Sequence, residues 1–247
     1  MHVEQLYKKN THSWMVMGRD AERNKDIIDT NHYLIQHNGR GLLLDPGGIE
    51  NFSSVATEFS KHFELANVEA IFVSHQDPNV LSSLPLWMQA NPDLIVYMPK
   101  SWVNYVTHIG IKLENIRAVP DEGGTLTLAG YDIELVPAHY MHSPANLSVY
   151  DPGAKILFSG DIGAALLPEA YDLFVSDFDD HTQYMEAFHR RWMASNTAKM
   201  RWIAEVRKRD VEMICPQYGA IFKGEDVARF LSWLENLDVG SAWSNVR

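Results

Sequence analysis

Short apolar runs separated by polar turns are the dominant pattern along this chain. Residues 70–74 read Ala-Ile-Phe-Val-Ser. Because this run is short, β-branched and without polar alternation, it predicts a strand buried on both faces. Residues 124–128 and 131–136 instead alternate apolar and polar positions around Ala129-Gly130. That alternation predicts a pair of strands with one face in the core and one in water.

Other segments complete a mixed pattern of strands and helices. Further strands are expected at residues 33–36, 41–44, 94–98, 147–150, 155–158 and 212–215. Helices are expected at residues 53–63, 79–88, 182–194, 197–208 and 226–237. Asn38-Gly39 predicts the tight turn of a hairpin between the first two of these strands. Strands cluster in both halves, so the pattern predicts an α/β fold with two sheets covered by helices, a sandwich of four layers.

We expect residues 1–247 to form a single domain, because the chain contains no repeat, low-complexity stretch or Pro/Gly/Ser linker. The formal net charge of −11 argues against a nucleic-acid-binding surface, which requires a basic patch. No run approaches the roughly 20 apolar residues of a membrane span. The N-terminus lacks the basic and apolar segments of a signal peptide, so a cytoplasmic protein is expected.

The chain has one cysteine, Cys215, within an apolar segment. A disulfide within the chain and a cysteine-ligated metal site are therefore excluded. Cys215 is expected to fill space in the core.

Histidines and carboxylates follow three of the expected strands. His75 and Asp77 come directly after the strand at residues 70–74, His139 and His142 follow a second strand, and Asp161 follows a third. In α/β folds the loops beyond the carboxyl ends of strands carry the functional side chains. The sequence therefore predicts a metal site assembled from separate loops.

The order of these segments resembles the metallo-β-lactamase family, from about residue 31 to residue 237. The resemblance rests on Leu42-Leu43-Leu44-Asp45-Pro46-Gly47-Gly48, Ser74-His75-Gln76-Asp77, Pro137-Ala138-His139-Tyr140-Met141-His142-Ser143-Pro144, Phe158-Ser159-Gly160-Asp161 and Pro216-Gln217-Tyr218-Gly219. It is strongest to the oxygen-reactive di-iron branch, which includes flavodiiron proteins and stand-alone oxygen-sensing relatives. Asp77 stands where hydrolases of the family carry a second histidine, and His142-Ser143-Pro144 is similar to the His-x-Pro segment of the branch.

The resemblance implies that His75, Asp77, His142 and Asp161 bind metal, with Asp161 shared between two iron ions. A carboxylate-rich site favours iron or manganese over zinc. For His139, three residues before His142, two alternatives stay open: it contacts substrate or hydrogen-bonds a ligand, or it is a surface or packed histidine without a role at the site.

The chain departs from the family pattern at the second metal ion. Asn79, Val80 and Tyr218 stand where the family has aspartate, histidine and histidine. Two alternatives remain open. Either the second site is weak or empty, or other residues rebuild it. His32 and His181 are the candidate substitutes, and Tyr218 and Asn79 could bind the ion or hydrogen-bond near it.

The implied function is a protein that binds O2, or alternatively NO, and reports it to a signalling or electron-transfer partner. We expect no flavin here, because no residues remain for a flavodoxin domain and no Gly-rich dinucleotide fingerprint is present. Rapid turnover is therefore not expected, and whether the protein is an enzyme stays open. A metal-dependent hydrolase and a metal-free scaffold are the alternatives, and a homodimer is compatible with the family.

Overall fold

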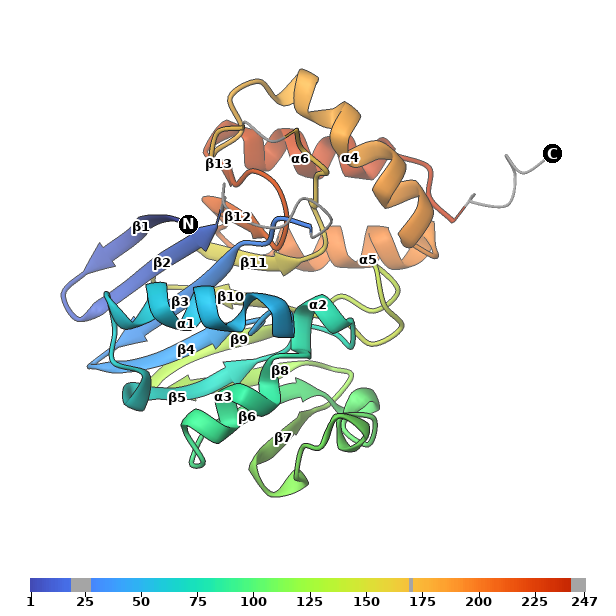
Figure 1. The fold of residues 1–247 in the computed structure, drawn as a ribbon. Coiled ribbons are helices and arrows are strands. Elements are labelled where there is room, and N and C mark those ends of the chain that lie inside the picture. The colour runs from blue at the N-terminus through green and yellow to red at the C-terminus, as the bar shows by residue number, and fades with distance from the viewer. Residues whose placement is uncertain (19–27, 169–170, 241–247) are drawn as a thin grey trace.

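Two β-sheets lie face to face, and helices cover the outer face of each (Figure 1). This computed structural model describes residues 1–18, 28–168 and 171–240. The first sheet contains, in spatial order, β1 (His2–Lys9), β2 (His12–Gly18), β3 (His32–His37), β4 (Arg40–Leu44), β5 (Val68–Phe72), β6 (Ile95–Pro99) and β7 (Ile116–Val119). The second contains β13 (Phe222–Lys223), β12 (Met213–Pro216), β11 (Ile156–Gly160), β10 (Leu147–Asp151), β9 (Tyr131–Pro137) and β8 (Gly124–Leu128).

The helices divide between the two outer faces. The first sheet is covered by α1 (Phe52–Ser60), α2 (Pro78–Leu81) and α3 (Leu84–Ala90), and the second by α4 (Phe178–Trp192), α5 (Asn196–Val206) and α6 (Glu225–Asn236). The expected four-layer α/β sandwich is confirmed. Among the described residues, no helix combines the length and the apolar character needed to cross a membrane.

The side chains of β2 show why both faces of the first sheet are buried. Trp14 and Val16 belong to the core between the sheets, whereas Met15 and Met17 belong to the core under the helices. Successive side chains of a strand point to opposite faces, so a strand buried on both sides is apolar throughout. This strand and its partner β1 were not expected from the sequence, because β2 shows none of the alternation that marks a half-exposed strand.

The expected helix at residues 79–88 is two helices, α2 and α3, because the chain between them is bound to a neighbouring loop. The Ser83 amide donates a hydrogen bond to the Gly47 carbonyl at 3.1 Å, and the Ser83 hydroxyl donates to the Pro46 carbonyl at 2.8 Å. These bonds compete with helical ones, as serine side chains commonly do. The break anchors the loop after β4 to the segment that follows His75.

Helix α4 begins at Phe178, four residues before the expected start at residue 182. The Asp177 carboxylate accepts hydrogen bonds from the Asp179 and Asp180 amides at the N-terminus of the helix. The acidic segment therefore caps the helix, as its composition indicates.

A buried carboxylate, Asp151, connects the two sheets at one end of the sandwich. It accepts hydrogen bonds from His12 Nε2 at 2.6 Å, Trp14 Nε1 at 2.6 Å and the Tyr131 hydroxyl at 2.5 Å. Burial by itself would raise the pKa of Asp151, but the hydrogen bonds outweigh it and hold the pKa below its usual value. Asp151 is therefore an ionised group whose charge is compensated within the protein.

We expect Asp151→Ala to lower the free energy of unfolding by about 3–5 kcal/mol, because the substitution leaves buried donors without an acceptor. Urea denaturation at pH 7 measures the change. Asp93→Ala, at an exposed position, is the control and should stay within about 0.5 kcal/mol of the wild type. A loss no larger in Asp151→Ala than in Asp93→Ala would contradict the assigned role.

Candidate metal centre

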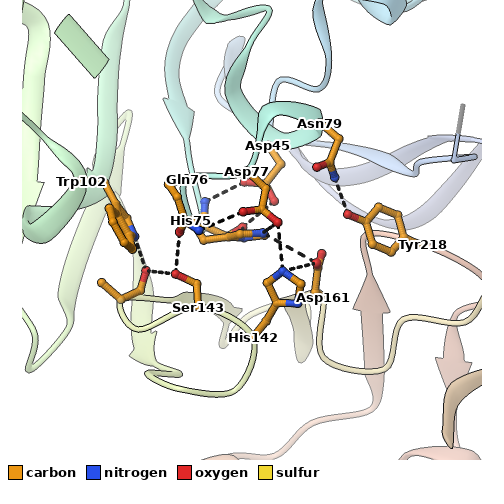
Figure 2. A network of polar contacts seen from close by, with 12 residues as sticks. Asp45, His75, Gln76, Asp77, Asn79, Trp102, His142, Ser143, Asp161 and Tyr218 are labelled. Carbon is orange, nitrogen blue, oxygen red and sulfur yellow. Dashed lines mark hydrogen bonds and ion pairs between the residues drawn. The ribbon is translucent and has the colours of Figure 1, made fainter. Parts of the chain in front are cut away.

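Four side chains from three loops meet at the end of the sandwich opposite Asp151 (Figure 2). His75 and Asp77 lie between β5 and α2, His142 lies in the loop between β9 and β10, and Asp161 follows β11. One ligand atom from each residue lies within 4.8 Å of all the others. The structure thus brings together the four residues that the sequence singled out as metal ligands.

The imidazole nitrogens and the carboxylate oxygens face each other. His142 Nε2 lies 3.0 Å from Asp77 Oδ2 and 3.2 Å from Asp161 Oδ2. His75 Nε2 lies 3.6 Å from Asp77 Oδ2 and 3.7 Å from Asp161 Oδ2. Two imidazoles and two carboxylates converging on one point are a typical donor set for a transition-metal ion.

Several of these atoms are buried without a partner. His75 Nε2 and both carboxylate oxygens of Asp161 have no hydrogen bond within the described part of the chain. Leaving such atoms unpaired is costly, and an unpaired buried charge costs most. Burial raises the pKa of Asp161, and it raises the pKa of the neighbouring Asp45 to about 7. These buried donor atoms without hydrogen-bond partners fit a bound cation.

Asp45 and Ser74 hold His75 in a defined orientation. The Asp45 carboxylate accepts hydrogen bonds from the amide and the hydroxyl of Ser74, each at 2.7 Å. The Ser74 oxygen lies 2.8 Å from His75 Nδ1. Since the single hydroxyl proton goes to Asp45, Nδ1 must carry a proton, and His75 Nε2 keeps its lone pair for a metal ion.

Neither Asp45 nor Ser74 was expected at the site. Asp45, in a turn-like Asp-Pro-Gly-Gly segment, follows a strand as His75 and Asp161 do. The position of Asp45 directly after a strand was the sequence signal that could have placed it at the site.

Gln76 connects the loop of His142 to Asp77. Its side-chain amide donates to Asp77 Oδ1 at 2.9 Å, and its carbonyl oxygen accepts from the Ser143 hydroxyl at 2.6 Å. Asp77 therefore has one oxygen bound by Gln76 and the other directed at the centre (Figure 2).

Aromatic side chains of α4 orient His142. Its ring stacks on Phe188, with centroids 5.7 Å apart, and on Trp192, at 5.0 Å. Its Nδ1 is buried and has no hydrogen-bond partner among the described residues, so stacking takes the place of a hydrogen bond. Trp192 is half exposed and covers the imidazole of His142. No sequence signal indicates this contact.

Asn79 and Tyr218 lie together on the Asp161 side of the centre. The Asn79 amide donates a hydrogen bond to the Tyr218 hydroxyl. Burial, together with the nearby charges of Asp161 and Asp77, raises the pKa of Tyr218 well above its usual value. Val80, in the next position, is buried in the core and offers no donor atom.

His32, His139 and His181 lie outside the group of four ligand atoms. The ring of His32 is buried against the backbone of Gly47, so closely that a Cβ added at residue 47 would lie 2.6 Å from it. Burial lowers the pKa of His32 to about 4. His139 Nε2 hydrogen-bonds the Asp121 carbonyl at 2.7 Å. His181 packs edge-on against Phe222 and lines a separate cavity of about 300 Å³.

The comparisons with known proteins identify the family. A family model described as "ODP family beta lactamase" matches residues 28–219, more than half of the chain. The chain belongs to this family. The match includes all four residues of the candidate centre as well as Asn79 and Tyr218.

Two solved structures of the family are similar over almost their full length. One, described as the apo state of the chemotaxis sensor ODP from T. denticola, is 38% identical, with a TM-score of 0.88 over 98% of this chain and 97% of that one. The other, described as a peroxy diiron species of chemotaxis sensor ODP, is 36% identical, with a TM-score of 0.88 over 99% and 98%.

More distant proteins share the fold. A flavo di-iron protein from Thermotoga maritima, solved as a point mutant, is 20% identical, with a TM-score of 0.80 over 94% of this chain and 60% of that one. An uncharacterised protein from Methanocaldococcus jannaschii is 22% identical over 83% of this chain. The chain spans about half, 53%, of the length of this curated relative.

Helix α4 also supports the loop that follows Asp161. The Gly163 amide donates to His189 Nε2 at 2.9 Å, and His189 Nδ1 donates to the Met185 carbonyl at 2.8 Å. Both ring nitrogens are therefore engaged in the neutral form. Burial lowers the pKa of His189 to about 4.

This lowered pKa predicts acid sensitivity. A histidine whose pKa falls on folding contributes its full stability above about pH 6.5, and that contribution is lost as the pH falls toward 4. The shift corresponds to about 3 kcal/mol. In urea denaturation from pH 7 to pH 4, His189→Gln should therefore lose less stability than the wild type, by about this amount. His108→Gln, at an exposed position, should follow the wild type. Equal pH dependence in wild type and His189→Gln would contradict the prediction.

The hydrogen bonds of Ser74 predict an effect on metal affinity. Ser74→Ala removes the acceptor for His75 Nδ1, and loss of such a partner typically weakens metal binding by about 10–100-fold. Competition with a chelator for Fe²⁺ under anaerobic conditions measures the change. Ser54→Ala, on the exposed side of α1, is the matched control and should bind as the wild type does. An affinity of Ser74→Ala within twofold of the control would show that Ser74 does not support the ligand.

Proposed function

We propose that this protein is a non-haem di-iron protein that binds O2 and acts as an oxygen sensor. The observation that carries the proposal is the likeness, over almost the whole chain, to structures of the chemotaxis sensor ODP, one described as a peroxy diiron species. The two-histidine, two-carboxylate centre supports it, because nitrogen and oxygen donors of this kind suit iron.

In this proposal His75, Asp77 and His142 hold the first iron ion, and Asp161 is shared with a second. The Asp161 carboxylate is suited to sharing, because both of its oxygens are buried and free of hydrogen bonds from the described residues. His75 offers Nε2 because Ser74 holds the proton on Nδ1. Bound ferrous ions would supply the electrons that reversible O2 chemistry requires.

The second ion is the part of the centre that differs from the usual family pattern. We assign Tyr218 and Asn79 to its surroundings, because the Tyr218 hydroxyl lies beside Asp161 and is bound by the Asn79 amide. His32 is the remaining histidine near this side, buried against the loop of Gly47. We assign no ligand role to His139 or His181, since each lies outside the group and has other contacts.

The residues around the centre limit access of water. Phe188 and Trp192 cover His142. Restricted access of water disfavours the activation of water for hydrolysis. The hydrolase alternative also lacks support from residue 80, where valine replaces the histidine expected of a hydrolase.

The proposed sensor acts through a partner. We propose that electrons and signals pass between the centre and a partner protein. O2 is the proposed gas, with NO as the alternative. A single domain spanning residues 1–247, a homodimer and a cytoplasmic location, where a ferrous centre stays reduced, complete the proposal.

Anaerobic iron loading tests the function. We expect the wild type to bind two Fe²⁺ per chain and to develop a persistent new absorption band when O2 is added. His142→Ala should bind less iron and lose the band, because it removes a ligand from the first ion. Metal analysis and anaerobic optical titration measure both results.

His62→Ala is the matched control, since His62 is exposed and does not belong to the group of four ligand residues. It should behave as the wild type. Wild-type protein that retains only zinc when expressed with ample iron, and whose spectrum does not respond to O2, would overturn the proposal. Hydrolysis of thioesters or phosphodiesters that disappears in His75→Ala would favour the hydrolase instead.

A further inference from the structure

A second pair of histidines lies at the end of the sandwich opposite the candidate metal centre. His12 begins β2 and His37 ends β3, and the two residues are direct partners in the antiparallel register. His32, at the other end of β3, is five residues away, roughly 16 Å along the strand. The pair is therefore separate from the proposed di-iron centre.

The two imidazoles point the same type of atom at each other. His12 Nδ1 and His37 Nδ1 lie 3.3 Å apart, and the ring centroids are 5.3 Å apart. Two histidine nitrogens bound to one tetrahedral ion at about 2.0–2.1 Å are separated by about 3.4 Å. The observed spacing, a hydrogen bond between the two nitrogens, is close to the separation of two ligands of one metal ion, which would take the place of the shared proton.

Asp151 fixes the orientation of His12. The ionised carboxylate can only accept, so His12 Nε2 carries the proton of their 2.6 Å hydrogen bond. In the neutral ring the lone pair is then on Nδ1, the atom that faces His37. A carboxylate bound to the far nitrogen of a histidine is the usual support for a metal ligand. Asp151 is itself held by Trp14 and Tyr131.

Tyr131 holds the second ring. His37 stacks on Tyr131, with centroids 4.8 Å apart and an interplanar angle of 27°. The same tyrosine contacts His12 at 4.4 Å and donates to Asp151. Both imidazoles are thus positioned by contacts that do not use their Nδ1 atoms. His12 is buried and His37 is partly exposed, so solvent can reach the pair from one side.

We propose that His12 and His37 form a second metal site, which binds a divalent transition-metal ion such as Zn²⁺ through both Nδ1 atoms. Asp151 hydrogen-bonds one ligand, and water completes the coordination. Nitrogen ligands without a direct carboxylate select Zn²⁺ or Cu²⁺ over Mg²⁺ and Ca²⁺. A bound ion would connect β2 to β3 and, through Asp151, to β10 of the other sheet (Figure 1).

Zinc stoichiometry tests the site without reference to the di-iron centre. Wild type, His37→Gln and His62→Gln are dialysed against Zn²⁺ at neutral pH, and bound metal is counted. Because the candidate di-iron centre is intact in all three proteins, a difference in the number of bound Zn²⁺ ions reports only on the His12–His37 pair. We expect His37→Gln to bind one Zn²⁺ fewer than the wild type, and His62→Gln, which removes an exposed histidine, to bind the wild-type number.

Imidazole resonances provide a second measurement on the unaltered protein. In ¹H–¹⁵N spectra of the wild type, Zn²⁺ should shift the Nδ1 signals of both His12 and His37. Equal stoichiometry in wild type and His37→Gln, an equal loss in His62→Gln, or unshifted Nδ1 signals would each overturn the site. If His12 and His37 bind no zinc, the iron-dependent O2 response can still be present. If the protein shows no O2 response, zinc binding by His12 and His37 can still be measured.

Discussion

The buried carboxylate of Asp161 is the constraint on which this end of the molecule depends. It lies close to Asp77 and Asp45, and the described groups that face its oxygens are the imidazoles of His75 and His142 and the Tyr218 hydroxyl. Such a group is tolerated only when a cation neutralises it or when it binds a proton. The arrangement therefore gives up stability in the metal-free protein and recovers it when metal binds.

Asp151, at the opposite end of the sandwich, shows the other solution to the same problem. It is as deeply buried as Asp161, yet imidazole, indole and phenol groups donate to it. The protein itself compensates this charge, so Asp151 stabilises the junction between the sheets. It also orients His12, and this is why a structural carboxylate can support a second metal site.

Helix α4 joins the centre to the surface. It stacks Phe188 and Trp192 on His142, and through His189 it binds the loop that follows Asp161. One rigid element thus contacts two ligand-bearing loops, while half of Trp192 remains exposed.

Local sequence was sufficient for the four-layer architecture and most strand positions, because buried strands leave a continuous signal along the chain, and the side chains that follow those strands include the four residues that meet at the candidate centre. It failed where the signal depends on distant partners. The strand β2 lacks alternation because helices and a second sheet cover both its faces, and the break before α3 arises from bonds to Pro46 and Gly47. Ser74 and Trp192 acquired roles only through residues far away in the sequence, and His12 met His37 only through strand pairing. The sequence by itself determined which chemical groups follow each strand. The tertiary structure decided which of these groups lie close enough to interact, because their partners are far away in the sequence.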